Sequence, residues 1–233
     1  MKHFRVFFFL GIAAMVSACN STDDKAVDTG LKYFPLTVGS FWIYDVSEVT
    51  FDTLAQNKIE TYQEKYEVAE GYENELKETV FVMHVSKRNT DNDPWNYAQT
   101  WSAKVSLLNE IIVSEENIPY IKLLIPVKEG LTWKGNKYNT IESDRNNGRV
   151  DEFSINDFKE PFENFTTTIT VYESDDLNFV YKDVRYSVYA EDIGLVYRKN
   201  NYVEYCDDID CFGLYLRKHE RTKIQTLKEY VNQ

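Results

Sequence analysis

The chain has 233 residues, of which 38 are acidic and 26 are Lys or Arg, and its formal net charge is −12 at pH 7. Nucleic-acid binding and charge-driven attachment to anionic membranes both need clustered Lys and Arg, so this balance argues against both. Aromatic residues make up 15% of the chain, with nine Gly and five Pro, which indicates a globular, strand-rich protein.

The first eighteen residues are predicted to be a lipoprotein signal peptide. A short basic start precedes the apolar run "VFFFLGIAAMV" (residues 6–16), which is too short to span a bilayer. The run ends in "VSAC" (residues 16–19), which resembles a bacterial lipobox, although Val16 stands where Leu is commoner. The resemblance implies cleavage between Ala18 and Cys19, diacylglycerol on the Cys19 thiol and an acyl chain on its new amine. The alternative is an ordinary secretory signal followed by a chance cysteine.

Residues 19–31 are predicted to be a lipidated flexible tether, because "NSTDDKAVDTG" (20–30) has too few large apolar side chains to order itself. Several acyl chains hold a protein firmly, so we expect a globular domain anchored to the membrane by its lipid. Position 20 is Asn and not the Asp that resembles an inner-membrane retention signal. Asp23-Asp24 looks somewhat like an acidic surface-export signal, and a solvated linker explains this pair equally well. We therefore expect the cell envelope, at the outer membrane, with its periplasmic or surface face left open.

The mature domain, residues 32–233, is predicted to be all-β. Its expected form is an antiparallel curved sheet or pair of sheets, half-barrel or sandwich-like. Alternation at period two predicts strands over 78–87, with two apolar faces, and over 165–174. The tail, 221–233, fits a helix or a strand, and we favour a strand because the rest of the chain is β.

Two hairpin turns are predicted from Asn and Gly, which accept positive φ. Residues 183–205 suggest two strands and then a turn at Asn200-Asn201 with a returning strand. Asn147-Gly148 is the stronger short hairpin signal.

One phrase occurs twice, as "FPLTVGSFW" (34–42) and "IPVKEGLTW" (125–133). In both copies Pro imposes an extended segment, Gly allows a turn closed to other residues, and Trp opens a strand. The repetition predicts two related halves, 32–124 and 125–233, packed into one β structure. The alternative is a chance match of one Pro, one Gly and one Trp.

Cys206 and Cys211 are predicted to form a disulfide, since an even pair in an oxidising compartment usually does. The closed loop is short, so the expected stabilisation is only about 2 kcal/mol. A metal site would recruit Asp207, Asp208 and Asp210 beside the two thiols. No His lies near, and this is not a usual zinc ligand set, so the disulfide is favoured.

Three stretches, "YFPLTVGSFWIYDV", "LLIPVKEGLTWKGNKYN" and "YSVYAEDIGLVYRK", resemble a family of uncharacterised β-rich bacterial lipoproteins of the outer-membrane type. That family shares the start "FPL-x-x-G-x-x-W-x-Y" and a late "YA-x-x-IGLVY". The resemblance implies an antiparallel β domain at the cell envelope, and it assigns no activity, cofactor or site residue.

No catalytic motif is present, and neither a cofactor nor a metal site is expected. The mature chain has two histidines: His84 lies mid-strand, and His219 is expected on a solvated face. The nearest approach to a glycosidase is "NTDNDPWNYAQTW" (89–101), where Asp91 and Asp93 precede Trp95 and Trp101. An Asx-rich turn before a strand explains the same residues.

We therefore expect a membrane-anchored lipoprotein that acts as a non-catalytic binding or interaction module for a protein or glycan. The alternative is a carrier of lipid or another apolar ligand in a β cavity, and a glycan-active enzyme is a further alternative. An apolar cavity of several hundred Å³ would favour the carrier. A filled core with an exposed aromatic patch would favour the interaction module.

Overall fold

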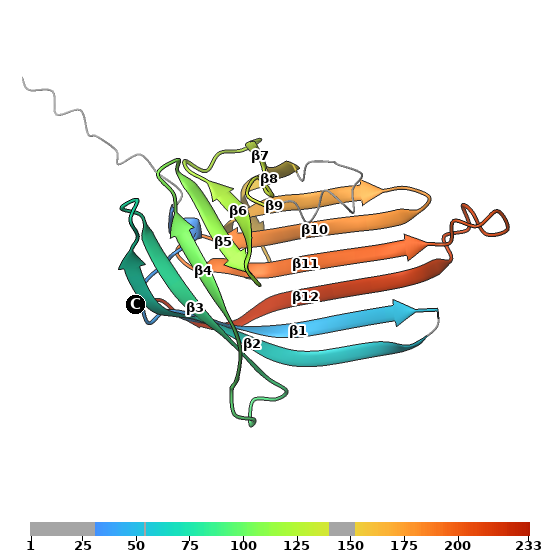
Figure 1. Ribbon diagram of the computed structural model, residues 1–233, viewed down its shortest axis with the longest axis horizontal. Coiled ribbons are helices and arrows are strands. Elements are labelled where there is room, and N and C mark those ends of the chain that lie inside the picture. Colours follow the sequence, from blue (N-terminus) through green and yellow to red (C-terminus); the bar gives the residue numbers. More distant parts are fainter. Residues whose placement is uncertain (1–30, 54, 140–151) are drawn as a thin grey trace, which may run out of the picture.

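The computed structural model describes residues 31–53, 55–139 and 152–233 (Figure 1). Within these ranges a single 3-10 turn, η1 (Leu31–Tyr33), precedes twelve strands, and no helix is long and apolar enough to cross a membrane. The strands are β1 (Phe41–Asp52), β2 (Ala55–Glu73), β3 (Thr79–Arg88), β4 (Asn96–Val105), β5 (Glu110–Glu115), β6 (Ile118–Leu124), β7 (Thr132–Lys134), β8 (Glu152–Phe162), β9 (Phe165–Leu177), β10 (Tyr181–Ala190), β11 (Gly194–Tyr205) and β12 (Arg217–Val231).

All twelve strands belong to one antiparallel sheet, in the order β6-β5-β4-β3-β2-β1-β12-β11-β10-β9-β8-β7. Consecutive strands pair with each other except β6 and β7, which form the two edges, and β12 returns to pair with β1 in the middle. The edges meet at one point, where the Ile121 amide donates to the Gly135 carbonyl (2.9 Å). The all-β prediction is confirmed as one sheet that curls almost closed.

The hydrophobic core fills one end of this curled sheet. In Figure 1, strands β3–β6 cross over the left-hand ends of β9–β12. The right-hand ends of β1, β2 and β9–β12 extend beyond this crossing. Between the two layers lie Trp42, Tyr44, Val85, Ile111 and Phe153, all buried. Each such side chain stabilises the fold by about 1.5–3 kcal/mol or more. The far part of the sheet leaves its concave face open, and this face holds the candidate site.

Both copies of the repeated phrase form a turn that leads into a strand. Gly39 and Gly130 have φ of 92° and 69°, in the left-handed region that favours glycine. Trp42 in β1 and Trp133 in β7 are buried, and each indole N–H donates to a backbone carbonyl (2.6 and 2.8 Å). The boundary at residues 124/125 falls between β6 and β7, with six strands on either side. The relationship between the two halves stays a prediction.

The predicted hairpin at Asn200-Asn201 is wrong, because β11 runs through it without a break. The chain reverses earlier, between β10 and β11, where Asp192 and Gly194 have positive φ (60° and 99°). Pairing with strands on both sides extends the two asparagines, and Asn201 Nδ2 donates to Thr222 Oγ1 (2.5 Å). Tertiary pairing has overridden a local turn preference.

The other predicted strands are present. Residues 78–87 and 165–174 correspond to β3 and β9, and the tail forms β12. The outer face of β3 is not fully covered, since His84 is exposed there. The signal peptide with Cys19, and the Asn147-Gly148 turn, lie outside the described residues.

Candidate functional site

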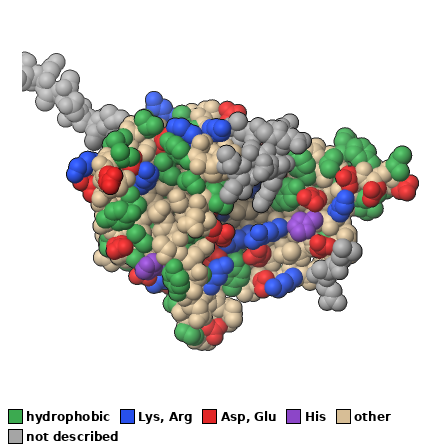
Figure 2. All heavy atoms as spheres, viewed as in Figure 1, with side chains coloured by type: hydrophobic (Ala, Val, Ile, Leu, Met, Phe, Trp, Pro, Cys, Tyr) green, Lys and Arg blue, Asp and Glu red, His purple; other side chains and the backbone are tan. Residues whose placement is uncertain are grey.

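The concave face of the sheet holds a cavity of about 750 Å³. Figure 2 shows a hollow beside the layer of β3–β6, with Lys, Arg and His side chains along its floor. Its lining is nearly balanced in charge, unlike the strongly acidic chain as a whole. It includes seven acidic side chains, Glu48, Glu64, Glu115, Glu116, Glu173, Asp183 and Glu204, and six basic ones, Lys87, Lys122, Arg185, Arg198, Arg221 and Lys223.

The strand β12 supplies one row of this lining, from His219, Arg221, Lys223 and Gln225. Successive side chains of a strand point to opposite faces, so these alternate positions share the concave face. The neighbouring β11 contributes Arg198, which pairs with Gln225 in the strand register, and the positions that alternate with it. The cavity floor is therefore a direct consequence of pleating and register.

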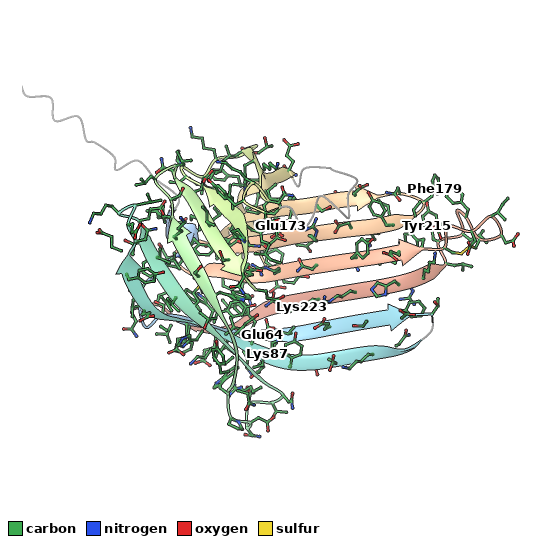
Figure 3. The ribbon with its side chains drawn as sticks, in the orientation of Figure 1. Glu64, Lys87, Glu173, Phe179, Tyr215 and Lys223 are labelled. Atoms are coloured by element: carbon green, nitrogen blue, oxygen red, sulfur yellow. A yellow bond between two sulfur atoms is a disulfide. The ribbon has the colours of Figure 1, made fainter. Side chains whose placement is uncertain are left out.

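Glu64 of β2 is the centre of a first charged cluster. Its carboxylate accepts hydrogen bonds from Lys223 Nζ (2.8 Å), Gln225 Nε2 (2.7 Å) and Tyr66 Oη (2.8 Å). Lys87 Nζ lies 3.1 Å from the same carboxylate, and Figure 3 shows the two lysines converging on it. Burial alone would raise the pKa of Glu64, but the two lysines and the hydrogen bonds outweigh burial and lower it. One buried, ionised carboxylate thus organises two cations.

A second cluster adjoins the first, since Arg198 pairs in register with Gln225. Arg198 Nη1 is 3.0 Å from Glu115 Oε1, and Lys122 Nζ lies 3.6 Å from Glu115 and 3.8 Å from Glu173. Ser187 Oγ donates to Glu173 (3.0 Å). Burial opposes ionisation, yet the Arg198 and Lys122 charges lower the pKa of Glu115 to about 2. The pKa of Glu173 is also lowered, by Lys122 first and then Arg198, against the effect of burial.

Apart from Glu115 Oε1, which lies 3.0 Å from Arg198 Nη1, three polar atoms of cavity-lining residues are buried without a hydrogen-bond partner among the described residues. They are Arg198 Nε, Trp101 Nε1 and Asn200 Oδ1. Arg198 and Trp101 are each only 8% exposed. Buried polar atoms are nearly always satisfied in proteins, so this wall has a hydrogen-bonding capacity that the protein itself does not complete.

The cavity offers hydrogen-bond donors, ionised acceptors and aromatic rings. A glycosidase acid needs a carboxyl group whose pKa is raised. The pKa values of Glu64, Glu115 and Glu173 are all lowered, so these groups stay ionised. Tyr62 and Tyr120 add rings to the lining, and burial raises the pKa of Tyr62, which keeps its hydroxyl neutral.

The structure does not bring the four glycosidase candidates together. Trp101 lines the cavity, with its ring 4.7 Å from that of Tyr66. Trp95 lies in the β3–β4 loop under the Arg88 guanidinium. Asp91 is exposed and pairs with Arg88 (3.0 Å) and Lys228 (2.6 Å).

The fourth candidate, Asp93, accepts a hydrogen bond from the Thr90 amide (2.9 Å), as an Asx-rich turn requires. The two histidines of the described chain lie in different surroundings. His84 is exposed and meets the Tyr97 ring edge-on (5.9 Å), whereas His219 lines the cavity with Nδ1 3.8 Å from Asp52.

Cys206 and Cys211 lie at disulfide distance in the β11–β12 loop, with Cα atoms 5.8 Å apart. Asp208 is the one acidic side chain that joins them in a group close enough for a metal ion among the described residues. Thiols joined in a disulfide are not available as ligands. Cys19, the predicted lipidation site, lies outside the described residues.

One apolar pocket in the core is small. A pocket of about 40 Å³ lies between Phe34, Trp42, Met83 and Leu195 in the core. This volume suits about one water molecule and is far below the several hundred Å³ of ligand pockets. This apolar pocket is therefore too small for a lipid, whereas the large cavity is lined mainly by charged and polar side chains.

Apart from Trp101 and His219, the residues that line the cavity were not predicted from the sequence. One signal was visible, the cations at alternate positions in "RKHERTK" (217–223), but it becomes a row only once the segment is known to be a strand. The partners on β2, β5 and β9 carry no local signal, because the curl of the sheet brings them together.

No protein-family model matches the chain, and no curated protein matches it. Among solved structures, the chain is similar to the crystal structure of a Parabacteroides distasonis protein that is provisionally described as a lipoprotein. The two share 15% sequence identity with a TM-score of 0.37, and the similarity covers 85% of this chain and 98% of that one. A likeness this weak does not bear on function.

Proposed function

We propose that the protein is a lipid-anchored, non-catalytic binding protein of the cell envelope that takes a polar ligand in the concave cavity. The cavity carries the proposal: its volume of about 750 Å³ lies within the range of ligand sites, and its lining is charged. The signal peptide and the lipobox-like "VSAC" support the anchor.

The ligand we propose is a saccharide. Paired cations and carboxylates both donate and accept hydrogen bonds, as sugar hydroxyls require of a site. Tyr62, Tyr120 and Tyr202 provide rings on which the apolar face of a pyranose can pack. The alternative, a carrier of lipid, is less well supported because the apolar space in the core is only about 40 Å³.

The experiment is a binding titration with purified residues 20–233, using neutral and uronic-acid-containing oligosaccharides and, separately, palmitate. Arg221→Ala and Tyr202→Ala should each weaken saccharide binding about tenfold. The Arg221 side chain is largely exposed and pairs with Glu48, so its loss should leave folding intact. Lys58→Ala is the matched control, since it removes the cation of another exposed ion pair, with Glu60, outside the cavity.

Three results would contradict the proposal. Palmitate binding without saccharide binding would favour the carrier. Conversion of the oligosaccharide to new masses during incubation would favour an enzyme. Retention of a Cys19→Ala variant in the membrane fraction would refute the lipid anchor, whatever the cavity binds.

A further inference from the structure

An apolar surface is exposed at the end of the sheet away from the core. We define the apolar tip by eight exposed side chains from the β9–β10 turn and the β11–β12 loop: Leu177, Phe179, Val180, Ile209, Phe212, Leu214, Tyr215 and Leu216. Ile209 is 96% exposed, and the other seven are 41–64% exposed. Contiguous apolar patches on a soluble domain mark interaction sites. Figure 3 shows Phe179 and Tyr215 close together at this end, far from Glu64 in the cavity.

The apolar tip is an ordered surface. The Phe179 ring lies against those of Phe212 (5.8 Å) and Tyr215 (6.0 Å), which joins the two loops. The Tyr205 amide donates to the Val180 carbonyl (2.7 Å), so the backbones are joined as well. Tyr215 has φ of 53°, a left-handed conformation that costs a non-glycine residue about 1 kcal/mol or more. Its ring is held in place at that cost while remaining half exposed.

Acidic residues surround the apolar tip. Residues 175–180 and 206–216 together contain five aspartates and no Lys or Arg. Asp207 pairs with Lys218 (2.6 Å), and Asp208 and Asp210 are exposed beside Ile209. Figure 2 shows acidic side chains among the apolar ones at this end. Lys182, Arg217 and Lys218 lie just beyond these two stretches, so the five aspartates leave the tip with a net negative charge. A partner that combines an apolar contact with positive charge fits this surface best.

Neither a membrane nor a second copy meets this requirement well. Anionic lipid surfaces repel aspartates, and two acidic tips repel each other.

We infer that the apolar tip docks onto another envelope protein, one that presents an apolar pocket bordered by Lys and Arg. The envelope setting of the partner rests on the lipid anchor of the proposed function, whereas the charge and exposure of the apolar tip do not.

The test is photo-crosslinking in the producing bacterium with a photoreactive amino acid at position 209 of the full chain. The control position is Leu107, which is 70% exposed in the β4–β5 turn. We expect one protein to be linked at position 209 and not at position 107. The purified partner should bind residues 20–233 about tenfold more weakly when Asp208→Lys and Asp210→Lys are combined, and binding should weaken as salt rises. These exposed substitutions should leave the melting temperature unchanged.

The inference is overturned if position 209 links phospholipid or a second copy, or if both positions link equally or not at all. It is also overturned if the charge reversal leaves the affinity of the purified pair unchanged. That affinity is measured without the lipid and without a saccharide, so failure of the anchor or of the cavity ligand would show separately.

Discussion

Each of the six Lys and Arg side chains that line the cavity has a carboxylate within 4 Å. Relative to a pair of apolar side chains, a pair as buried as Arg198–Glu115 adds little net stability, because desolvation offsets the attraction between the charges, whereas the loss of one partner alone is costly. An apolar core would have been a simpler way to fill the same space. We interpret these residues as a preorganised polar surface in which every charge is held in place before a ligand arrives.

Glu115 allows the cluster to be tested through pH. The carboxyl ionises in the folded state at a pKa of about 2, below its ordinary 4.5, so its contribution to stability is complete above about pH 4.5 and is lost as pH falls to 2. Two and a half pH units correspond to about 3 kcal/mol. Glu115→Gln should therefore lose about that much at pH 7, and its unfolding free energy should fall less steeply between pH 4.5 and 2 than that of the wild type.

Urea unfolding at a series of pH values measures this difference. Val113→Ala is the control, because it weakens the core from the same strand without a titratable group and should cost a similar amount at every pH. Parallel pH profiles for Glu115→Gln and the wild type would contradict the ion-pair interpretation.

At the scale of elements, the repeated phrase performs one local task in two different settings. Trp42 opens β1, which pairs along most of its length with β2 and β12 in the middle of the sheet. Trp133 lies in β7, an edge strand of three residues that pairs only with β8. The glycine turn and buried indole of the first copy therefore stabilise the centre of the sheet. Those of the second copy stabilise the seam, where the edge strands β6 and β7 meet.

This difference predicts unequal effects of removing the indole N–H. Trp42→Phe leaves the half-buried Ile193 carbonyl without its donor and should lower the global unfolding free energy by about 1–3 kcal/mol. Trp133→Phe removes the donor to the Ile121 carbonyl at the seam, so it should mainly speed hydrogen exchange of the Ile121 amide. Hydrogen exchange measured residue by residue, with Trp95→Phe as control, distinguishes the effects of the two substitutions. Equal losses of global unfolding free energy, with an unchanged exchange rate of the Ile121 amide, would contradict this prediction.

At the scale of the whole molecule, the sequence predicted what is local and missed what is distant. Period-two alternation was enough for β3 and β9, and the Gly–Trp spacing was enough for both turns. The sequence pattern could not show that β12 pairs with β1, although the two strands lie at opposite ends of the chain. This pairing curls the sheet. The cavity depends on that curl, because Glu64 and Lys223 are 159 residues apart in sequence. The turn predicted at Asn200-Asn201 was wrong for the same reason, because pairing with strands on both sides determines the conformation of these residues.

The compartment of the whole molecule can be tested through Cys206 and Cys211. Residues 20–233 contain no other cysteine, so protein exported to the periplasm should show no free thiol before reduction and two after it. The pair closes a short loop at the apolar tip, so replacing both residues by Ser should cost only about 2 kcal/mol and leave the core folded. Two free thiols in the exported, unreduced protein would contradict the disulfide. This holds whether or not the thiols bind a zinc ion together with Asp208. The same protein made in a reducing cytoplasm should carry both thiols free, which separates the effect of compartment from that of the fold.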